Sequence, residues 1–148
     1  MEITLKVNKE AVYNEVAKTT EYTGAKMPDE QAYDVIATTE EDQAMLERFW
    51  NECKNMICNS LKKILVSEIE EDGDYKLTLG LSAAFDESLI ESMQRGLFSF
   101  FVINITAKWY TFANKSEVTV YAAEAAACVD DILRKAFYKK RPQRPTYE

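Results

Sequence analysis

The sequence contains no histidine, and only four glycines, three prolines and three cysteines occur among its 148 residues. The absence of histidine excludes Ser-His and Cys-His nucleophile pairs, histidine-ligated zinc sites and carboxylate-histidine di-iron centres. The glycines fit neither a P-loop nor a dinucleotide-binding fingerprint, in which glycine lets backbone N–H groups approach phosphate. We therefore expect a protein that is not an enzyme and that holds no cofactor and no metal.

The three cysteines, Cys53, Cys58 and Cys128, are too few for a four-thiolate zinc site and do not form a C-x-x-C motif. We expect the cysteines to be small buried residues of the core. An odd number of cysteines indicates a reducing compartment, because an oxidising one would favour paired cysteines. No apolar run approaches the roughly 20 residues that a membrane-spanning helix needs. The first residues lack the basic and apolar regions of a secretory signal. These features predict an intracellular protein, or one in a particle assembled inside a cell, without membrane contact.

Apolar residues make up 47% of the chain and charged residues 29%, which is ordinary for one globular domain. The expected fold class is mainly α (α+β), as a four- to five-helix bundle with a β-hairpin and a short N-terminal strand. We expect residues 1–138 to form a single helical-bundle domain with the hairpin at about 65–81. Residues 139–148 are expected to form an extended basic C-terminal arm, because this segment has prolines and no apolar periodicity.

Apolar residues recur at helical spacing in several segments, and they alternate with polar residues in others. The alternating segments are Glu2 to Val7 and Tyr75 to Leu81, with the turn at Glu71 to Asp74 between the second strand and its partner. The helical segments are Lys9 to Thr23, Asp29 to Ala37, Thr38 to Ile64, Asp86 to Phe112 and Asn114 to Ala136.

Residues of special backbone preference mark the expected ends of these helices. Asn8 is expected to cap the first helix, and Gly24 is expected to end it. Asp86 or Ser88 is expected to cap the helix that follows the hairpin, and Ser88 and Glu91 have the spacing of a capping box. The segment Asp86 to Phe112 is apolar nearly all round in its second half, which indicates the central helix; its β-branched and aromatic content leaves a strand as the alternative.

Charge is unevenly distributed along the chain. Six basic residues and one acidic residue give the segment 134–148 a side-chain charge of +5, so the preceding residues carry −12. A basic arm on an acidic body indicates an acidic partner, either nucleic acid or the acidic surface of a neighbouring subunit. The alternative is a helix that ends in basic residues, favourable to its dipole, followed by a disordered end.

Several side-chain groups have both a chemical and a structural interpretation. The carboxylates around the hairpin turn could attract a hard cation, although their spacing is not that of an EF-hand, or they simply keep the turn soluble. These carboxylates are Glu68, Glu70, Glu71, Asp72 and Asp74. The pairs Glu87 with Glu91 and Glu117 with Glu124 could divide acid and base roles, and the interpretation we favour is a solvated helix face.

The central helix carries two further candidates. Asn104 and Lys108 interrupt its apolar sequence one turn apart, and Lys108 is either a buried nucleophile or, as we prefer, a lysine at the helix edge. Its aromatic residues could line a ligand pocket, and core packing is the interpretation that we favour. The aromatic set is Phe98, Phe100, Phe101, Trp109, Tyr110 and Phe112.

Two segments carry a resemblance to a known family. The segment Tyr13 to Gly24, ending in Tyr-Thr-Gly, resembles a helix of gp6-like head-tail connector (adaptor) proteins of tailed bacteriophages. The segment Glu40 to Trp50 is similar to the acidic helix opening common in that family. The order of helices, hairpin, two further helices and an arm also resembles the family, whereas the N-terminal strand and the order of the first two helices differ from it.

The resemblance implies a non-enzymatic virion structural protein, a neck subunit whose copies form a homo-oligomeric ring between portal and tail. Its partners would be further copies of itself and the portal and tail proteins, with passive contact to the packaged DNA. It would be located in the virion and, during assembly, in the host cytoplasm. The expected interaction arm comprises Lys139, Lys140, Arg141, Arg144 and Tyr147, and the expected hairpin contact comprises Asp72, Gly73 and Asp74. The competing hypothesis is a small intracellular adaptor or regulatory helical bundle that binds nucleic acid or an acidic protein through the same arm.

Overall fold

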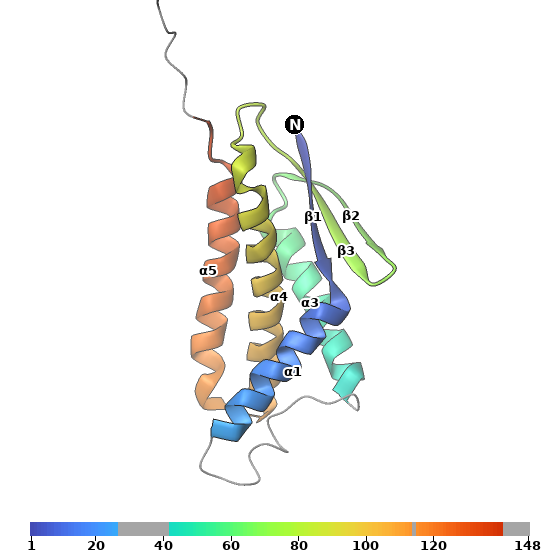
Figure 1. Ribbon diagram of the computed structural model, residues 1–148, viewed down its shortest axis with the longest axis vertical. Helices are drawn as coiled ribbons and strands as arrows, with labels where there is room; N and C mark the ends of the chain where they lie inside the picture. Colours follow the sequence, from blue (N-terminus) through green and yellow to red (C-terminus); the bar gives the residue numbers. More distant parts are fainter. Residues whose placement is uncertain (27–41, 114, 141–148) are drawn as a thin grey trace, which may run out of the picture.

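A computed structural model of the chain describes residues 1–26, 42–113 and 115–140 (Figure 1). Within these ranges the protein is mainly helical and mixed α+β, with four α-helices and a three-stranded antiparallel sheet. The predicted helix Asp29 to Ala37 and the predicted start of the next helix at Thr38 lie outside the described residues. The helices are α1 (Lys9–Lys26), α3 (Gln43–Ser60), α4 (Ile90–Ala113) and α5 (Val118–Ala136), and the strands are β1 (Glu2–Asn8), β2 (Leu65–Glu71) and β3 (Asp74–Gly80).

The N-terminal strand is part of the same sheet as the predicted hairpin. β3 lies in the middle and pairs antiparallel with both β1 and β2, in the order β1-β3-β2. Alternate residues of β1 and β3 face the helices and are buried, because the side chains of a strand point to opposite faces in turn. These buried residues are Ile3, Leu5, Val7, Tyr75, Leu77 and Leu79. The expected separate strand and hairpin therefore become one sheet with one buried face.

Helix α1 follows β1 without a loop. The Asn8 side chain accepts a hydrogen bond from the backbone N–H of Ala11 at 2.9 Å, which confirms the predicted N-cap. The helix does not end at Gly24 as expected but continues to Lys26. Val12 and Val16 are fully buried against the rest of the core.

Helix α4 is the central helix of the molecule. It contacts α5, α1, α3 and β1, and Figure 1 shows it between α5 and the sheet. Gly96 lies where α5 crosses closely: a Cβ at this position would be 3.4 Å from the Cγ1 of Ile132. The predicted strand alternative for the segment is wrong. The four helices match the expected bundle only roughly. Helices α1 and α3 each pack against α4, and they make few contacts with each other.

Helix α3 is shorter than expected, since it ends at Ser60 instead of continuing to Ile64. A turn with hydrogen bonds to Leu61 then leads into β2. A short 3-10 helix, Glu87–Leu89, precedes α4. Asp86 caps this short helix by accepting from the Ser88 backbone N–H at 3.1 Å, which confirms one of the two predicted caps, whereas no capping box forms between Ser88 and Glu91.

An aromatic cluster joins the sheet to the helices. The ring centroids of Trp50 and Phe101 are 4.6 Å apart, and Tyr75 packs against both rings at 6.2 and 5.9 Å. All three side chains are at most 1% exposed. In α4 itself, Phe100, Phe101 and Tyr110 are fully buried, and Phe98 and Trp109 are partly buried against the core. Core packing is therefore confirmed for most of the predicted aromatic set, whereas Phe112 is 65% exposed. No helix in the described ranges has the length and apolarity to cross a membrane.

Candidate functional site

The base of the basic C-terminal segment is attached to the loop before α4. Lys139 forms an isolated antiparallel bridge with Phe85, and the backbone N–H of Lys140 donates to the Ala84 carbonyl at 2.7 Å. The Asp86 N–H donates to the Tyr138 carbonyl at 3.2 Å. The chain therefore leaves α5 in a fixed direction up to Lys140.

Both side chains at the start of the predicted arm are exposed, namely those of Lys139 and Lys140. The remaining predicted arm residues, Arg141, Arg144 and Tyr147, lie outside the described residues. Beside the two lysines, Phe137 is 61% and Tyr138 56% exposed. The described part of this end thus combines positive charge with exposed aromatic rings.

The predicted hairpin contact lies at the tip of the β2–β3 turn. Asp72 and Gly73 both have positive φ, 53° and 79°, which glycine and aspartate tolerate better than other residues. The Asp74 carboxylate accepts from the Asn8 amide at 2.9 Å and pairs with Lys6 at 3.4 Å. The hydrogen bond from Asn8 and the charge of Lys6 hold the pKa of Asp74 below its usual value. Asp72 is exposed at the tip, whereas Asp74 is tied to β1.

A cluster of charged and aromatic side chains lies between the helix-facing side of β2 and the helices α1 and α3. Glu70 accepts from the Trp50 indole N–H at 3.2 Å and forms ion pairs with Lys54 and, at 3.4 Å, with Lys9. Lys9 also pairs with Glu47 at 2.6 Å. Burial would raise the pKa of Glu70, but the bonds and charges of both lysines outweigh it and lower the pKa. The carboxylate is ionised and fully partnered.

Two tyrosines complete this cluster. The Tyr13 hydroxyl donates to Glu47 at 2.8 Å, and the Tyr75 hydroxyl donates to Glu68, which also accepts from the Cys58 thiol at 2.7 Å. Burial, reinforced by these partners, raises the pKa of both tyrosines, so they remain protonated donors. The hydrogen bonds from Cys58 and Tyr75 lower the pKa of Glu68. Among the described residues, every buried side-chain nitrogen and oxygen has a hydrogen-bond partner.

This arrangement is suited to holding β2 in place rather than to catalysis. β2 is an edge strand, and charged residues that point inward from an edge strand oppose pairing with another sheet. The turn was expected to be solvated, yet Glu68 and Glu70 are engaged with α3. In the parts of the chain that the structure describes, no three metal-ligating side chains come close enough to hold an ion.

The three thiols are protonated and poorly nucleophilic at neutral pH. Burial raises the pKa of Cys53 to about 12 and also raises the pKa of Cys58 and Cys128. A thiol attacks only as the thiolate, so raised values argue against a reactive cysteine.

The predicted polar pair on α4 has structural partners. The amide of the buried Asn104 donates to the Cys53 sulfur at 3.1 Å, and Lys108, whose side chain is 29% exposed, pairs with Glu52 at 2.9 Å. Lys108 therefore lies at the helix edge, which is the interpretation that we favoured over a buried nucleophile. The two predicted carboxylate pairs lie at the surface. Glu87, Glu91 and Glu124 are exposed, which agrees with solvated faces, and Glu117 is half-buried.

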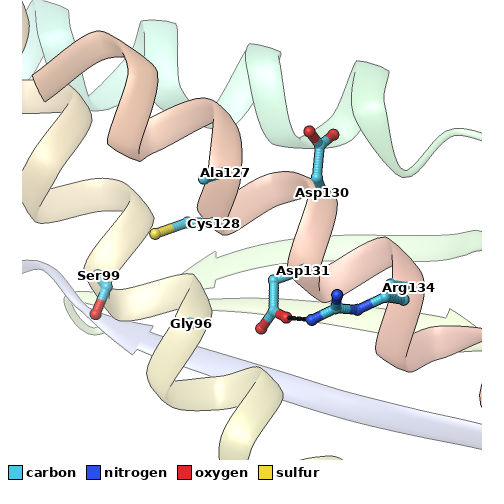
Figure 2. A pocket seen from close by; sticks show the side chains of 7 residues that line it. All are labelled: Gly96, Ser99, Ala127, Cys128, Asp130, Asp131 and Arg134. Carbon is cyan, nitrogen blue, oxygen red and sulfur yellow. Dashed lines mark hydrogen bonds and ion pairs between the residues drawn. The ribbon is translucent and has the colours of Figure 1, made fainter. Parts of the chain in front are cut away.

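An open pocket of about 620 Å³ lies along the α4–α5 groove (Figure 2). Small side chains from both helices line it, and the Asp131 carboxylate points toward Arg134, with which it is ion-paired. Asp131 also pairs with Lys135 at 2.6 Å. Figure 2 shows Asp130 directed away from Asp131, so the two carboxylates do not converge on one ligand. The lining residues are Gly96, Ser99, Ala127, Cys128, Asp130, Asp131 and Arg134.

A second groove lies between the end of α3 and the end of α5 and has a volume of about 440 Å³. Its lining combines two lysines with two apolar side chains: Asn59, Ser60, Lys62, Lys63, Leu133 and Phe137. This groove was not predicted from the sequence. Its signal in the sequence was weak, because Lys62 and Lys63 belong to a predicted helix and Phe137 is far from them along the chain.

Comparison with known proteins gives no relative from which an activity could be transferred. No family model, no curated protein and no solved structure matches the chain.

Proposed function

We propose that this protein is a non-enzymatic structural subunit of a phage or prophage particle, a head-tail connector that forms a ring between portal and tail. In this proposal the chain is a four- to five-helix bundle with a hairpin and a basic arm, located in the virion and, during assembly, in the host cytoplasm. The resemblance of Tyr13 to Gly24 and of Glu40 to Trp50 to connector helices supports it.

The observation that carries the proposal is the charge separation together with the fixed base of the arm. The residues before Arg134 carry −12, and the segment from Arg134 carries +5. Backbone bonds from residues 84–86 orient the chain as far as Lys140. A basic segment that leaves an acidic body at a defined point is suited to contact between neighbouring subunits, because opposite charges favour docking in one orientation.

The first experiment is to sequence the DNA that flanks the gene and to look for the chain in purified particles by mass spectrometry. Portal, capsid or tail genes on either side and the chain in mature particles are the expected results. Metabolic or regulatory neighbours and particles that lack the chain would contradict the proposal.

Two truncations test the role of the arm. Removal of residues 139–148 should leave the fold intact and lower the yield of complete particles. Removal of 141–148 preserves the backbone bonds of Lys139 and Lys140, so it separates the loss of the arm from any loss of its attachment. A normal particle yield from both truncations would count against the arm.

The second candidate is an adaptor or regulatory bundle that binds nucleic acid or an acidic protein. Exposed aromatic rings beside lysines at Phe137 to Lys140 favour it, because such surfaces bind single-stranded nucleic acid. Tight binding of the isolated monomer to DNA, with affinity falling steeply as salt rises, would favour this candidate over the connector.

A further inference from the structure

The groove between the ends of α3 and α5 is positively charged, and its charges are not neutralised within the described chain. Lys62 and Lys63 are exposed, and neither forms an ion pair with any described residue. Leu133 is half-buried and Phe137 is 61% exposed, so the same groove presents apolar surface. An occupant with two negative charges next to an apolar side chain would match it.

The β2–β3 turn has these properties. Glu71 and Asp72 are exposed, and neither has an ion-pair partner among the described residues, in contrast to Glu70 and Asp74. Ile69, two residues before Glu71, is 55% exposed. The turn also has a defined backbone shape, because Asp72 and Gly73 hold the left-handed conformation that joins two paired strands.

Resting on the proposed function, we propose that the acidic β2–β3 turn of one copy docks in the basic α3–α5 groove of the next copy. Glu71 and Asp72 would face Lys62 and Lys63, and Ile69 would contact the apolar side chains of the groove. The turn cannot reach the groove of its own chain. β2 carries it roughly 20 Å from the end of α3 at about 3.3 Å per residue, and Figure 1 shows it on the side opposite α5.

One other occupant of the groove and one other site on the subunit fit less well. The basic segment 139–148 has the same sign of charge as the groove and is repelled by it. The α4–α5 pocket offers no equivalent site for a charged partner, since its Asp131 is already paired with Arg134 and Lys135.

The contact uses two different surfaces of each subunit, so it is heterologous. A heterologous contact repeats from copy to copy and generates a closed ring or an open filament, whereas an isologous contact stops at a dimer. The proposed contact therefore gives the ring of the connector proposal a physical basis in named residues.

A charge exchange tests the contact with the full chain. The groove variant is Lys62→Glu with Lys63→Glu, and the turn variant is Glu71→Lys with Asp72→Asn, since asparagine tolerates the positive φ at this position. Each variant alone opposes like charges across the contact, so self-association should weaken by about tenfold or more. Sedimentation velocity over a concentration series measures the strength of self-association.

Mixing the two variants is the decisive step. The acidic groove of the first variant then meets the basic turn of the second, and the second variant's native groove meets the first variant's native turn. An equimolar mixture should therefore associate again, within about threefold of the unmodified chain, by the same charge pairing. The matched control is Lys18→Glu with Arg95→Glu, which makes the same change of charge at exposed positions outside the groove and should associate normally.

Other outcomes overturn the proposal. These are an unmodified chain that stays monomeric, single variants that associate normally, or a mixture that stays apart. Binding of a 20-mer oligonucleotide that is lost in the groove variant, without rescue by mixing, would make the groove a nucleic-acid surface instead. The contact and the connector function can fail separately. If mixing restores association but purified particles lack the chain, only the connector function is overturned. If particles contain the chain but mixing does not restore association, only the contact is overturned.

Discussion

At the scale of single residues, hydrogen bonds to carboxylates connect β2 to α3. Glu68 accepts from Tyr75 and Cys58, and Glu70 accepts from Trp50 and is paired with Lys54. These donors satisfy carboxylates that would otherwise be costly to place against the core. They give β2 a fixed position although most of its side chains are exposed.

Tyr75→Phe removes the hydroxyl group and leaves the ring in place. Tyr75 is 1% exposed and its hydroxyl contacts both Glu68 and Cys58, so the free energy of unfolding should fall by about 1–2 kcal/mol. Urea unfolding followed by circular dichroism measures this change. Tyr138→Phe is the control, because Tyr138 is 56% exposed, and an equal loss in both variants would contradict the role of the Glu68 contact.

The carboxylates of the same cluster make stability depend on pH. The pKa values of Glu47, Glu68 and Glu70 are below the ordinary value of 4.5 in the folded protein. Below that value the unfolded chain binds more protons than the folded one, so the free energy of unfolding falls as pH drops from about 5 toward 3.

Urea midpoints measured between pH 7 and pH 3 test this dependence. Glu70→Gln should reduce the loss of stability on acidification, because this carboxylate loses its ion pairs when protonated. Glu71→Gln, at the exposed turn, serves as the control. The same acid sensitivity in Glu70→Gln and in the unmodified protein would show that Glu70 does not contribute.

At the scale of elements, Asn8 joins three parts of the molecule. It ends β1, caps α1 through Ala11 and donates to Asp74 at the hairpin turn. The Lys9 N–H, next in the chain, donates to the Gly73 carbonyl at 2.8 Å. The junction between strand and helix therefore also fixes the base of the hairpin.

Asn8→Ala should lower the free energy of unfolding by about 1 kcal/mol, the usual cost of losing an N-cap. Asn8→Ser keeps a capping oxygen but loses the longer amide, so it should recover most of the loss. Thermal and urea unfolding of the two variants compare them. If Asn8→Ser is as destabilised as Asn8→Ala, the cap is not the source of the effect.

At the scale of the whole molecule, one core joins the sheet to all four described helices. Trp50 from α3, Tyr75 from β3 and Phe101 from α4 contact one another at its centre. A single shared core predicts a single cooperative unfolding transition.

Phe101→Ala removes the ring at the centre of that core and should cost about 3–5 kcal/mol of unfolding free energy. Tryptophan fluorescence and far-ultraviolet circular dichroism should give one midpoint, lowered equally by both probes. Phe112→Ala is the control, since Phe112 is 65% exposed. Separate midpoints for the two probes would indicate that the sheet and the helices unfold independently.

The sequence by itself determined which segments become helices and strands and how charge is divided. Apolar spacing is a local property, so it was enough to identify α1, α3, α4, α5 and the strands on either side of Asp72–Gly73. The ends were less well determined: α1 passes Gly24 and α3 stops at Ser60. Helix ends depend on caps and on packing with neighbours, which local spacing does not encode.

Only the tertiary structure decided which segments meet. The pairing of β1 with β3 and the hydrogen bonds of Glu68 and Glu70 depend on contacts between segments that lie apart in the sequence. The groove formed by Lys62, Lys63 and Phe137 arises in the same way, because α3 and α5 bring these residues together at one end of the molecule. Local periodicity fixes the face that each element buries, whereas the partner on that face is chosen by packing of the whole chain.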